Sequence, residues 1–468
     1  MADIVEGGPL PAAEAAALEA RTGAHRGASP LGQFAWAAFD GARSPYNVLV
    51  NIFVFSAYFS TVVVPDSVRG QAVWSYVTST GAFLVAIGAP ILGAIADAGG
   101  RRKPWLIATV ILGVPCMSLI WFATPGMSHG LIWVMAAIVG STLAFEYSAI
   151  FCNAMLPNVA PQGRLGFLSG LGFALGNFFG VLVFLFFLLA WSWNPHPLFG
   201  LDAARHEPER AVGMLAAAWF AVFAIPLLLF TPDSPGTSRS VPQAVSHGLK
   251  TLAGTLSKLG HYRNAATFLG ARMLYNEGFI VLMLFTGVFA AGILHWTPTM
   301  LIAEGLINSV VAALAGLGAG WLDTRIGSKA SSMLFVGGCL AANLVLCSVT
   351  PDMVFFIHVA PPLVPHGLFP SLPDKVFLVA QCSCAMFVTG GLVTSRALMA
   401  KLSPRAMLNE FFGLFALSGT ATSFIGPLSI GVLTTLAHSQ RAGVAVGIVF
   451  LLSGLLVMTL VKEHPAEG

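Results

Sequence analysis

Twelve apolar stretches, each long enough to cross a membrane, constrain this 468-residue chain more than any other feature. A helix rises about 1.5 Å per residue, so about 20 apolar residues span the roughly 30 Å hydrocarbon core of a bilayer. The stretches lie near residues 45–64, 74–97, 104–124, 130–152, 166–190, 211–230, 265–291, 296–321, 330–350, 374–399, 409–436 and 441–461. We therefore predict an all-α membrane protein with twelve transmembrane helices.

The composition excludes the other broad classes of protein. Apolar residues make up 56% of the chain and charged residues only 9%, whereas soluble domains carry roughly 25% charged residues. A disordered chain is excluded too, because it would need far more charge and less apolar surface. The net charge of +3 does not indicate a nucleic-acid partner.

The polar segments divide the chain into two sets of six spans. Residues 231–264 change composition, with a Pro- and Ser-rich start followed by scattered basic residues. We expect an N-terminal tail (1–35), a six-helix bundle (36–230), a linker (231–264), a second six-helix bundle (265–462) and a short C-terminal tail (463–468). The first 32 residues lack the basic and apolar regions of a signal peptide, so we expect a tail rather than a cleaved leader.

The basic residues predict the orientation in the membrane. With both termini in the cytoplasm, 17 Lys and Arg residues lie inside and five outside, and one more lies within a span. Cytoplasmic loops carry such an excess. We expect both termini in the cytoplasm.

The two sets of spans show traces of an internal duplication. The sequence A-R-x-x-Y-N begins at Ala42 and again at Ala271, 229 residues later. Phe-Ala-Leu recurs at residues 173–175 and 415–417, and the basic loop after the second span is partly repeated after the eighth. Internal repeats of this kind are common in transporter folds. The matches favour a six-plus-six arrangement of two pseudo-symmetric bundles.

The loop after the second span has the pattern G-x-x-x-D-x-x-G-R-R, and it resembles the loop signature of the major facilitator superfamily. Its residues are Gly93, Asp97, Gly100, Arg101 and Arg102. We expect Gly93 to let two helices touch and Asp97 to cap a neighbouring helix. The alternative is an ordinary basic loop on the cytoplasmic side.

More specifically, the chain resembles the bacterial relatives of the vacuolar amino-acid effluxers, a branch of that superfamily. The resemblance rests on residues 39–47, 93–105, 170–177, 262–264, 271–278, 410–419 and 422–427. It implies a bacterial inner-membrane transporter whose spans one, four, seven and ten line a central cavity.

Polar residues follow one face of each of those four spans. The candidates for the cavity are Arg43, Asn47, Asn51, Glu146, Arg272, Asn276 and Arg396. Arginine suits the recognition of carboxylates, which favours an amino acid or another small carboxylate as substrate. An alternative is that Arg43 and Glu146 form a structural gate, and Ser44–Pro45 could also begin the first helix after Arg43.

Two further carboxyl groups lie within spans, Glu277 and Glu304. Ionisable residues inside a membrane usually face a cavity or a partner, and a carboxyl shielded from water holds its proton more readily. Both are therefore candidates for proton coupling. The alternative for each is a hydrogen bond to a neighbouring helix.

The sequence favours a secondary transporter that works by alternating access. No G-x-x-x-x-G-K-[ST] loop for ATP and no H-E-x-x-H or G-x-S-x-G pattern of a hydrolase occurs. We expect a monomer that is not an enzyme and that needs neither cofactor nor metal. The alternatives are a transporter of an uncharged solute such as a sugar, and a membrane scaffold or sensor on a transporter fold.

Overall fold

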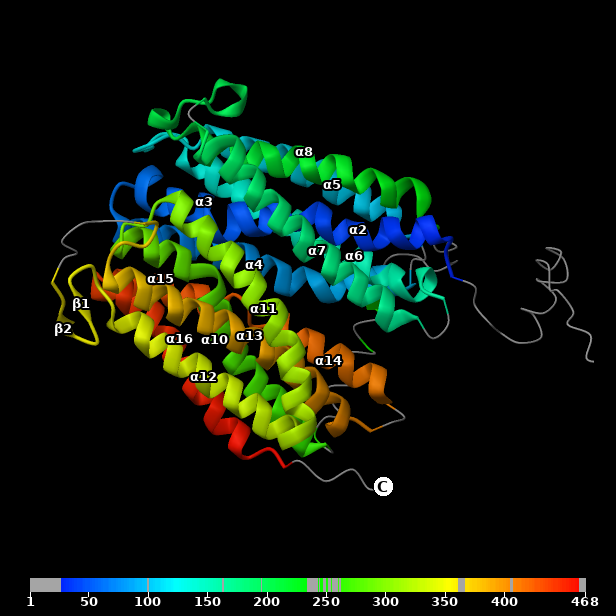
Figure 1. The fold of residues 1–468 in the computed structure, drawn as a ribbon. Coiled ribbons are helices and arrows are strands. Elements are labelled where there is room, and N and C mark those ends of the chain that lie inside the picture. Colours follow the sequence, from blue (N-terminus) through cyan, green and yellow to red (C-terminus); the bar gives the residue numbers. More distant parts are fainter. Residues whose placement is uncertain are drawn as a thin grey trace, which may run out of the picture.

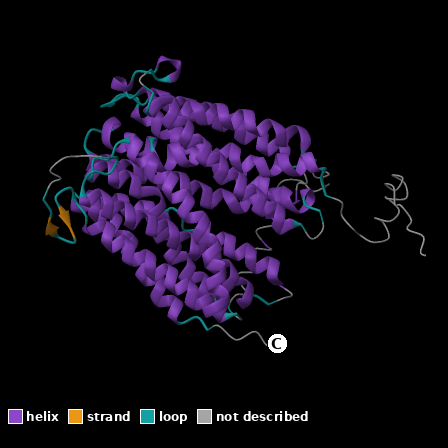
Figure 2. Cartoon of the chain, viewed as in Figure 1, coloured by secondary structure: helices purple, strands orange, loops and turns teal. Residues whose placement is uncertain are grey.

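The computed structural model describes residues 27–98, 101–161, 164–194, 196–233, 262–360, 367–404 and 407–462, and a few isolated positions between 243 and 260. Within these residues, 12 helices are long and apolar enough to cross a membrane. The described part of the chain is almost entirely helical (Figure 2). The prediction of an all-α protein with twelve transmembrane helices is confirmed.

We number the membrane spans one to twelve along the chain. Span one combines α2 (Pro30–Pro45), a π-helical turn (Tyr46–Phe53), α3 (Phe55–Tyr58) and a second π-helical turn (Phe59–Val63). Spans two to six are α4 (Ser67–Ala98), α5 (Lys103–Leu119), α6 (Leu131–Val159), α7 (Leu165–Phe187) with its extension Leu188–Ser192, and α8 (Glu207–Phe230).

The second set of six spans follows the segment after residue 233. Spans seven to ten are α10 (Arg263–Ile293), α11 (Pro298–Ile326), α12 (Ser328–Ser348) and α13 (Leu372–Leu402). Span eleven consists of α14 (Leu408–Thr420) and α15 (Ile425–Ala437), and span twelve is α16 (Gln440–Thr459).

Span one begins earlier than the hydropathy pattern predicts. Its first helix starts at Pro30, where the Ser29 hydroxyl accepts a hydrogen bond from the Gly32 N–H at 3.1 Å. Ser29–Pro30 is thus the helix-starting pair, and Ser44–Pro45 lies inside the helix. Pro45 has no N–H to donate, and the backbone changes to π-helical geometry directly after it.

Span eleven is broken, whereas the sequence predicts one continuous helix over residues 409–436. The helix stops at Thr420 and restarts at Ile425. Pro427 explains the break, because a proline ring clashes with the carbonyl four residues earlier in a continuous helix. That carbonyl belongs to Ser423, inside the break.

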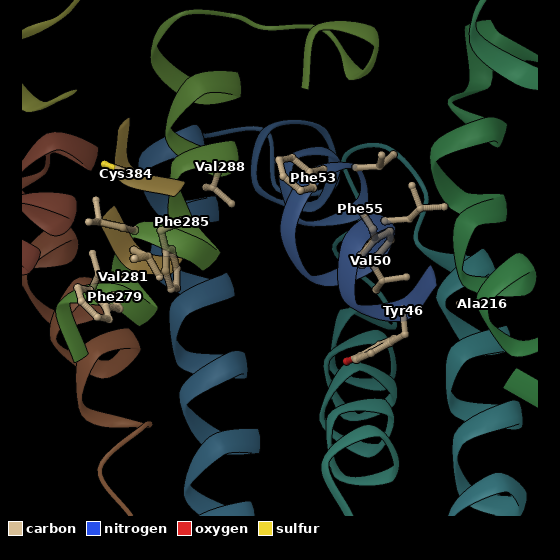
Figure 3. Packing of buried hydrophobic residues seen from close by; sticks show 14 of the residues in the cluster. Tyr46, Val50, Phe53, Phe55, Ala216, Phe279, Val281, Phe285, Val288 and Cys384 are labelled. Carbon is tan, nitrogen blue, oxygen red and sulfur yellow. The ribbon is translucent and has the colours of Figure 1, made fainter. Parts of the chain in front are cut away.

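Spans one and seven form the centre of the protein. In each, 67% of the most apolar stretch is buried, against 22–50% in the other ten spans. Figure 3 shows aromatic side chains of both spans in the core, among them Tyr46 and Phe53 from span one and Phe279 and Phe285 from span seven. Large apolar side chains such as Ile111 and Leu317 are 67% and 77% exposed, as expected for a surface that faces lipid.

The repeated A-R-x-x-Y-N sequence plays the same structural part in both sets. The Tyr46 hydroxyl lies 3.0 Å from the Thr142 hydroxyl on α6, which is the fourth span of the first set. The Tyr275 hydroxyl lies 2.7 Å from the Ser395 hydroxyl on α13, which is the fourth span of the second set. The structure therefore supports the duplication that the sequence indicates.

The two ends of the bundle differ. We call the end where α2 begins and α16 finishes the terminal end, and the opposite end the distal end. The two sets of helices approach each other at the distal end and diverge towards the terminal end (Figure 1). A short hairpin of β1 (Met353–Val354) and β2 (Ile357–His358) lies at the distal end, between spans nine and ten.

Candidate functional site

A cavity of about 170 Å³ lies between the two sets of spans. Pockets for drug-sized ligands measure about 300–1,000 Å³, so this cavity suits a small solute. Its apolar wall comes from both sets, and its polar side chains are amides and hydroxyls. Its lining includes Val48, Phe53, Asn177, Phe184, Asn308 and Gln381.

Hydrogen bonds close the distal end between the two sets. The Gln71 side chain on α4 donates to the Thr434 hydroxyl on α15 at 2.8 Å and to the Gln440 carbonyl oxygen at 3.0 Å. Further along the chain, the hydroxyls of Ser192 and Thr299 are hydrogen-bonded to each other. These contacts lie where α4, α11 and α16 begin, so they seal the cavity on the distal side.

Small residues bring the two central spans together. A Cβ atom at Gly287 on α10 would lie 2.6 Å from the Ile52 carbonyl oxygen of span one. Glycine is common at such contacts in membrane proteins because lipid supplies no hydrophobic drive between helices. The backbone contact of Gly287 and Ile52 therefore depends on the missing side chain.

Glu304 lies beside the cavity with two amide side chains. It is fully buried on α11, and its Oε1 accepts a hydrogen bond from the Asn308 amide at 3.1 Å. Gln381 on α13 also lies next to Glu304, and its amide donates to the Thr286 hydroxyl at 2.5 Å. Asn308 and Gln381 both line the cavity.

Arg272 and Asn276 hold the end of α14, the first half of the broken span eleven. Arg272 Nη1 donates to the Phe415 carbonyl oxygen at 2.7 Å and to the Ser418 hydroxyl at 2.6 Å. Its guanidinium carbon also lies 3.7 Å from the centre of the Phe415 ring. Asn276 donates to the Gly419 carbonyl oxygen at 3.3 Å. A cation is favourable at a helix C-terminus.

Glu277 holds the start of α15, the second half of that span. Its Oε2 accepts a hydrogen bond from the Gly426 N–H at 2.8 Å. A carboxylate is favourable at a helix N-terminus, where N–H groups lack partners. Span seven thus stabilises both sides of the break with groups of suitable charge.

Arg43 contacts its own helix and α6 in this conformation. It forms an ion pair with Asp40 at 3.2 Å on its own helix, and its guanidinium carbon lies 4.2 Å from the centre of the Phe145 ring. Arg43 and Glu146 form no direct ion pair in this conformation, although Arg43 is near enough to act electrostatically on the Glu146 carboxyl group. Their role as a gate pair stays a prediction. Glu146 is half-buried on α6.

Three of the four predicted spans line the cavity, but with other residues than the sequence predicts. Its walls belong to spans one, five, seven, eight and ten. Span four contributes none of its lining, and spans five and eight replace it. None of the seven predicted cavity residues lines this cavity, namely Arg43, Asn47, Asn51, Glu146, Arg272, Asn276 and Arg396.

Two of the predicted residues lie close to the cavity in the sequence. Asn47 and Asn51 each precede a lining residue, Val48 and Ile52. Arg396 is exposed. Sequence reasoning missed Gln381, although an amide inside an otherwise apolar run is a usable signal.

The loop motif after span two is described only in part. The side chain of Asp97 and the whole of Gly100 lie outside the described residues. A Cβ atom at Gly93 would meet nothing within 4 Å. Among the residues that the structure describes, the expected close helix contact at Gly93 is therefore absent.

The basic half of the loop starts α5. The N–H groups of Arg102 and Lys103 donate to the Asp233 carboxylate at 2.8 and 3.3 Å. Arg101, one residue earlier, is exposed. Asp233 follows span six, so this contact ties the ends of spans three and six together at the terminal end.

The described part of the chain contains no group of three or more His, Cys, Asp or Glu that could hold a metal ion. The arrangement of cavity, buried carboxyl and two converging sets of helices can bind a small solute. It offers no arrangement of a nucleophile with a base in the cavity lining.

Comparison with known proteins places the chain among transporters. Its sequence matches the family described as vacuole effluxer Atg22 like, over residues 60–165 and 162–467. An uncharacterized MFS-type transporter of Bacillus subtilis, YxiO, is 24% identical over 437 residues, which cover 92% of this chain and 94% of the relative. Autophagy-related protein 22 of Cryptococcus neoformans is 26% identical over 62% of this chain, which spans 48% of that protein.

Solved structures share the fold. A D-xylose-proton symporter superposes with a TM-score of 0.63 at 13% identity, covering 93% of this chain and 97% of the other. A bacterial homologue of the human lysosomal transporter Spinster, in an inward-facing and unoccupied conformation, gives a TM-score of 0.60 at 14% identity, covering 94% and 98%. The family match covers most of the residues that carry the cavity and the broken span. The chain belongs to the vacuole effluxer Atg22-like family, and its fold is that of the major facilitator transporters.

Proposed function

We propose that this protein is a secondary transporter that moves a small solute across the bacterial inner membrane by alternating access. The observation that carries the proposal is the cavity between the two sets of spans, sealed at the distal end. Transporters of this architecture rock two bundles around a central site. The protein is expected to work as a monomer.

The orientation with both termini in the cytoplasm makes the observed conformation inward-open. This orientation rests on the excess of basic residues at the terminal end. In it, Asp97 and Arg101 of the loop after span two lie on the cytoplasmic side, and we propose that they stabilise the outward-open state. Cysteine labelling from each side of the membrane tests the orientation.

The preferred substrate is an amino acid or another small carboxylate. The resemblance to amino-acid effluxers supports this class. The arginines support it less than the sequence predicts, because Arg43 is paired with Asp40 and Arg272 is engaged by span eleven.

An uncharged solute such as a sugar is the second candidate. The amides and hydroxyls of the cavity lining, such as Asn177 and Thr389, favour it. A thermal-shift screen of amino acids and sugars on the purified protein separates the two, since a ligand of the native state raises its stability. Flux of the stabilising solute into proteoliposomes then tests transport itself, and an absence of flux for every binder would contradict the proposal.

Proton coupling is assigned to Glu304 in preference to Glu277. Glu304 lies beside the cavity, whereas Glu277 is bonded to the start of α15. The change Glu304→Gln is expected to abolish uphill transport driven by a proton gradient, because the amide cannot exchange a proton. Downhill exchange of solute should persist at saturating solute concentration.

The measurement is substrate-driven pH change inside proteoliposomes. Glu277→Gln is the comparison variant, with the same change in a buried carboxyl of the preceding span. Full proton-coupled transport by Glu304→Gln would exclude Glu304, and the same result with both variants would exclude proton coupling through either group.

The change Gly287→Val should favour the state that is open at the distal end. A valine side chain would meet the Ile52 carbonyl oxygen and push spans one and seven apart. Overpacking of this kind costs about 1–3 kcal/mol, which shifts a two-state equilibrium by about fivefold to 150-fold.

The readout is labelling of Cys384, a native cavity cysteine, in a variant whose other five cysteines are replaced. A membrane-impermeant thiol reagent applied at the distal side should react faster in Gly287→Val. Gly318→Val, where a Cβ meets nothing within 4 Å, is the control. An unchanged rate of Cys384 labelling in Gly287→Val would show that the contact of Gly287 with Ile52 does not help to close the distal end.

A further inference from the structure

Three oxygen atoms beside the cavity are buried and accept no hydrogen bond. They are Oε2 of Glu304, Oδ1 of Asn308 and Oε1 of Gln381. Glu304 is 0% exposed and Gln381 6% exposed. Buried polar atoms nearly always have partners, and leaving an acceptor unpaired costs free energy. Three such atoms around one cavity indicate that a bound ligand supplies their hydrogen-bond partners.

The hydrogen bonds around Gln381 fix which of its atoms is free. The Thr286 hydroxyl donates its single proton to the Leu282 carbonyl oxygen at 2.7 Å. The Thr286 hydroxyl therefore accepts a hydrogen bond from the amide nitrogen of Gln381, which lies 2.5 Å away. The amide oxygen of Gln381 is thus the atom left without a partner.

The hydrogen bond to Glu304 likewise determines which side-chain atom of Asn308 has no partner. Its amide nitrogen donates to Glu304 Oε1, because a carboxylate oxygen accepts and a flipped amide would place two acceptors together. The oxygen of Asn308 is left over. The unpaired atoms of all three residues are therefore acceptors, and the missing group must be a donor.

When Glu304 is ionised, electrostatics favours a cationic donor. Within the described residues, Glu304 forms no ion pair with Lys, Arg or His, and its titratable neighbours are the thiols of Cys382 and Cys384. A buried carboxylate without a counter-charge is unfavourable. A cation that donates hydrogen bonds would satisfy both the charge and the three oxygens.

We propose that Glu304, Asn308 and Gln381 form a binding site for the primary ammonium group of the transported solute. An ammonium group carries three N–H donors and no acceptor, which matches three unpaired oxygen atoms. The inference rests on the proposed function, because it takes the cavity to be the solute site. It places the amine of the solute at the α11–α13 side of the cavity.

The opposite wall of the cavity is apolar. Val48 and Phe53 of span one and Phe184 of span five line it. An amine with a hydrocarbon body would therefore place its charged end on Glu304 and its body against the first set of spans. Such a ligand contacts both sets at once, as a solute that drives their closure must.

Three related compounds test the assignment on the purified full chain. L-Leucine carries both charged groups, 3-methylbutylamine lacks its carboxylate, and 4-methylpentanoate lacks its amine. The measurement is the apparent Kd of each from thermal-shift titration, with sodium chloride and choline chloride compared at equal ionic strength. We expect the amine and leucine to bind and 4-methylpentanoate to leave the melting temperature unchanged.

Variants then locate the site. Glu304→Gln should raise the Kd of the amine by about tenfold to a hundredfold, the range for a hydrogen bond to a charged group. Gln381→Met leaves the Glu304 carboxyl group in place and should raise the Kd of the amine less. It serves as a second variant in case Glu304→Gln does not fold. Glu209→Gln, the same change on span six beside His206, should leave the Kd unchanged.

Several results would overturn the site. Binding of 4-methylpentanoate as tight as that of the amine would do so, as would stabilisation by sodium alone. An unchanged Kd in both Glu304→Gln and Gln381→Met would also overturn it. If wild-type proteoliposomes transport leucine in that case, the transporter function stands and only the ammonium site fails. If they transport no solute, the proposed function fails independently of binding.

Discussion

Replacing Arg272 by methionine is expected to lower the free energy of unfolding by about 3 kcal/mol or more. The side chain is only 7% exposed, and it makes two short hydrogen bonds to α14. Hydrogen bonds to a charged group contribute about 1.5–3 kcal/mol each. Methionine keeps much of the length of the side chain and removes every donor.

The loss should be large because Arg272 supports a helix that is already broken. The break after Thr420 leaves the last turn of α14 short of backbone donors, although the Ala421 N–H still reaches the Leu417 carbonyl oxygen. Arg272 and Asn276 supply donors to that end. Without the guanidinium group, the Ser418 hydroxyl also loses a buried partner.

Thermal unfolding of the purified protein measures the effect. Arg263→Met is the matched control, because Arg263 begins the same helix and is exposed. Its melting temperature should stay near that of the wild type. A melting temperature of Arg272→Met equal to that of Arg263→Met would show that the contacts to α14 contribute nothing.

The membrane spans are predictable because hydropathy alone requires them. Each apolar run is long enough to cross a bilayer, and no other environment accepts twelve of them. The repeated A-R-x-x-Y-N sequence was informative for the same reason, since Tyr46 and Tyr275 each need a hydroxyl partner when buried. These features depend on local sequence and burial, so they can be predicted from a single amino-acid sequence.

The ends and breaks of helices were harder to predict. Ser29–Pro30 and Ser44–Pro45 are equally good helix starts by sequence, and hydropathy favours the wrong one. The break in span eleven depends on Pro427, which sequence reasoning treated as part of a continuous apolar run. Its stabilisation by Glu277 comes from 149 residues away along the chain, and sequence spacing carries no record of that contact.

The cavity residues on span one were displaced for a geometric reason. The predicted stripe of Asn47 and Asn51 assumes 100° per residue, the value for an α-helix. Tyr46–Phe53 is π-helical, with hydrogen bonds to the fifth residue, so each residue turns less. The cavity accordingly receives Val48 and Ile52 instead.

Arg43 and Arg272 do not line this cavity, because their partners lie on their own side of the protein. Arg43 is paired within its helix and Arg272 with span eleven. Glu304 and Asn308, in contrast, are four residues apart on one helix, and that spacing is readable in a sequence. Gln381, on a different span, completes the group only in three dimensions.

Alternating access is the central claim, and it requires the distal end to open. Ser192 and Thr299 join spans five and eight there through a direct hydrogen bond. Two cysteines at these positions would have sulfur atoms close enough for a disulfide. Such a bond would hold the distal end closed while leaving the cavity and both sets of helices intact.

The most direct test is therefore solute flux in proteoliposomes that carry Ser192→Cys and Thr299→Cys in a background without the six native cysteines. Single-cysteine variants serve as controls for each substitution. Oxidation should reduce flux to that of protein-free liposomes, and reduction with dithiothreitol should restore it, whereas the single variants should respond to neither. Full flux with the disulfide formed in nearly all molecules would contradict transport by alternating access in this protein.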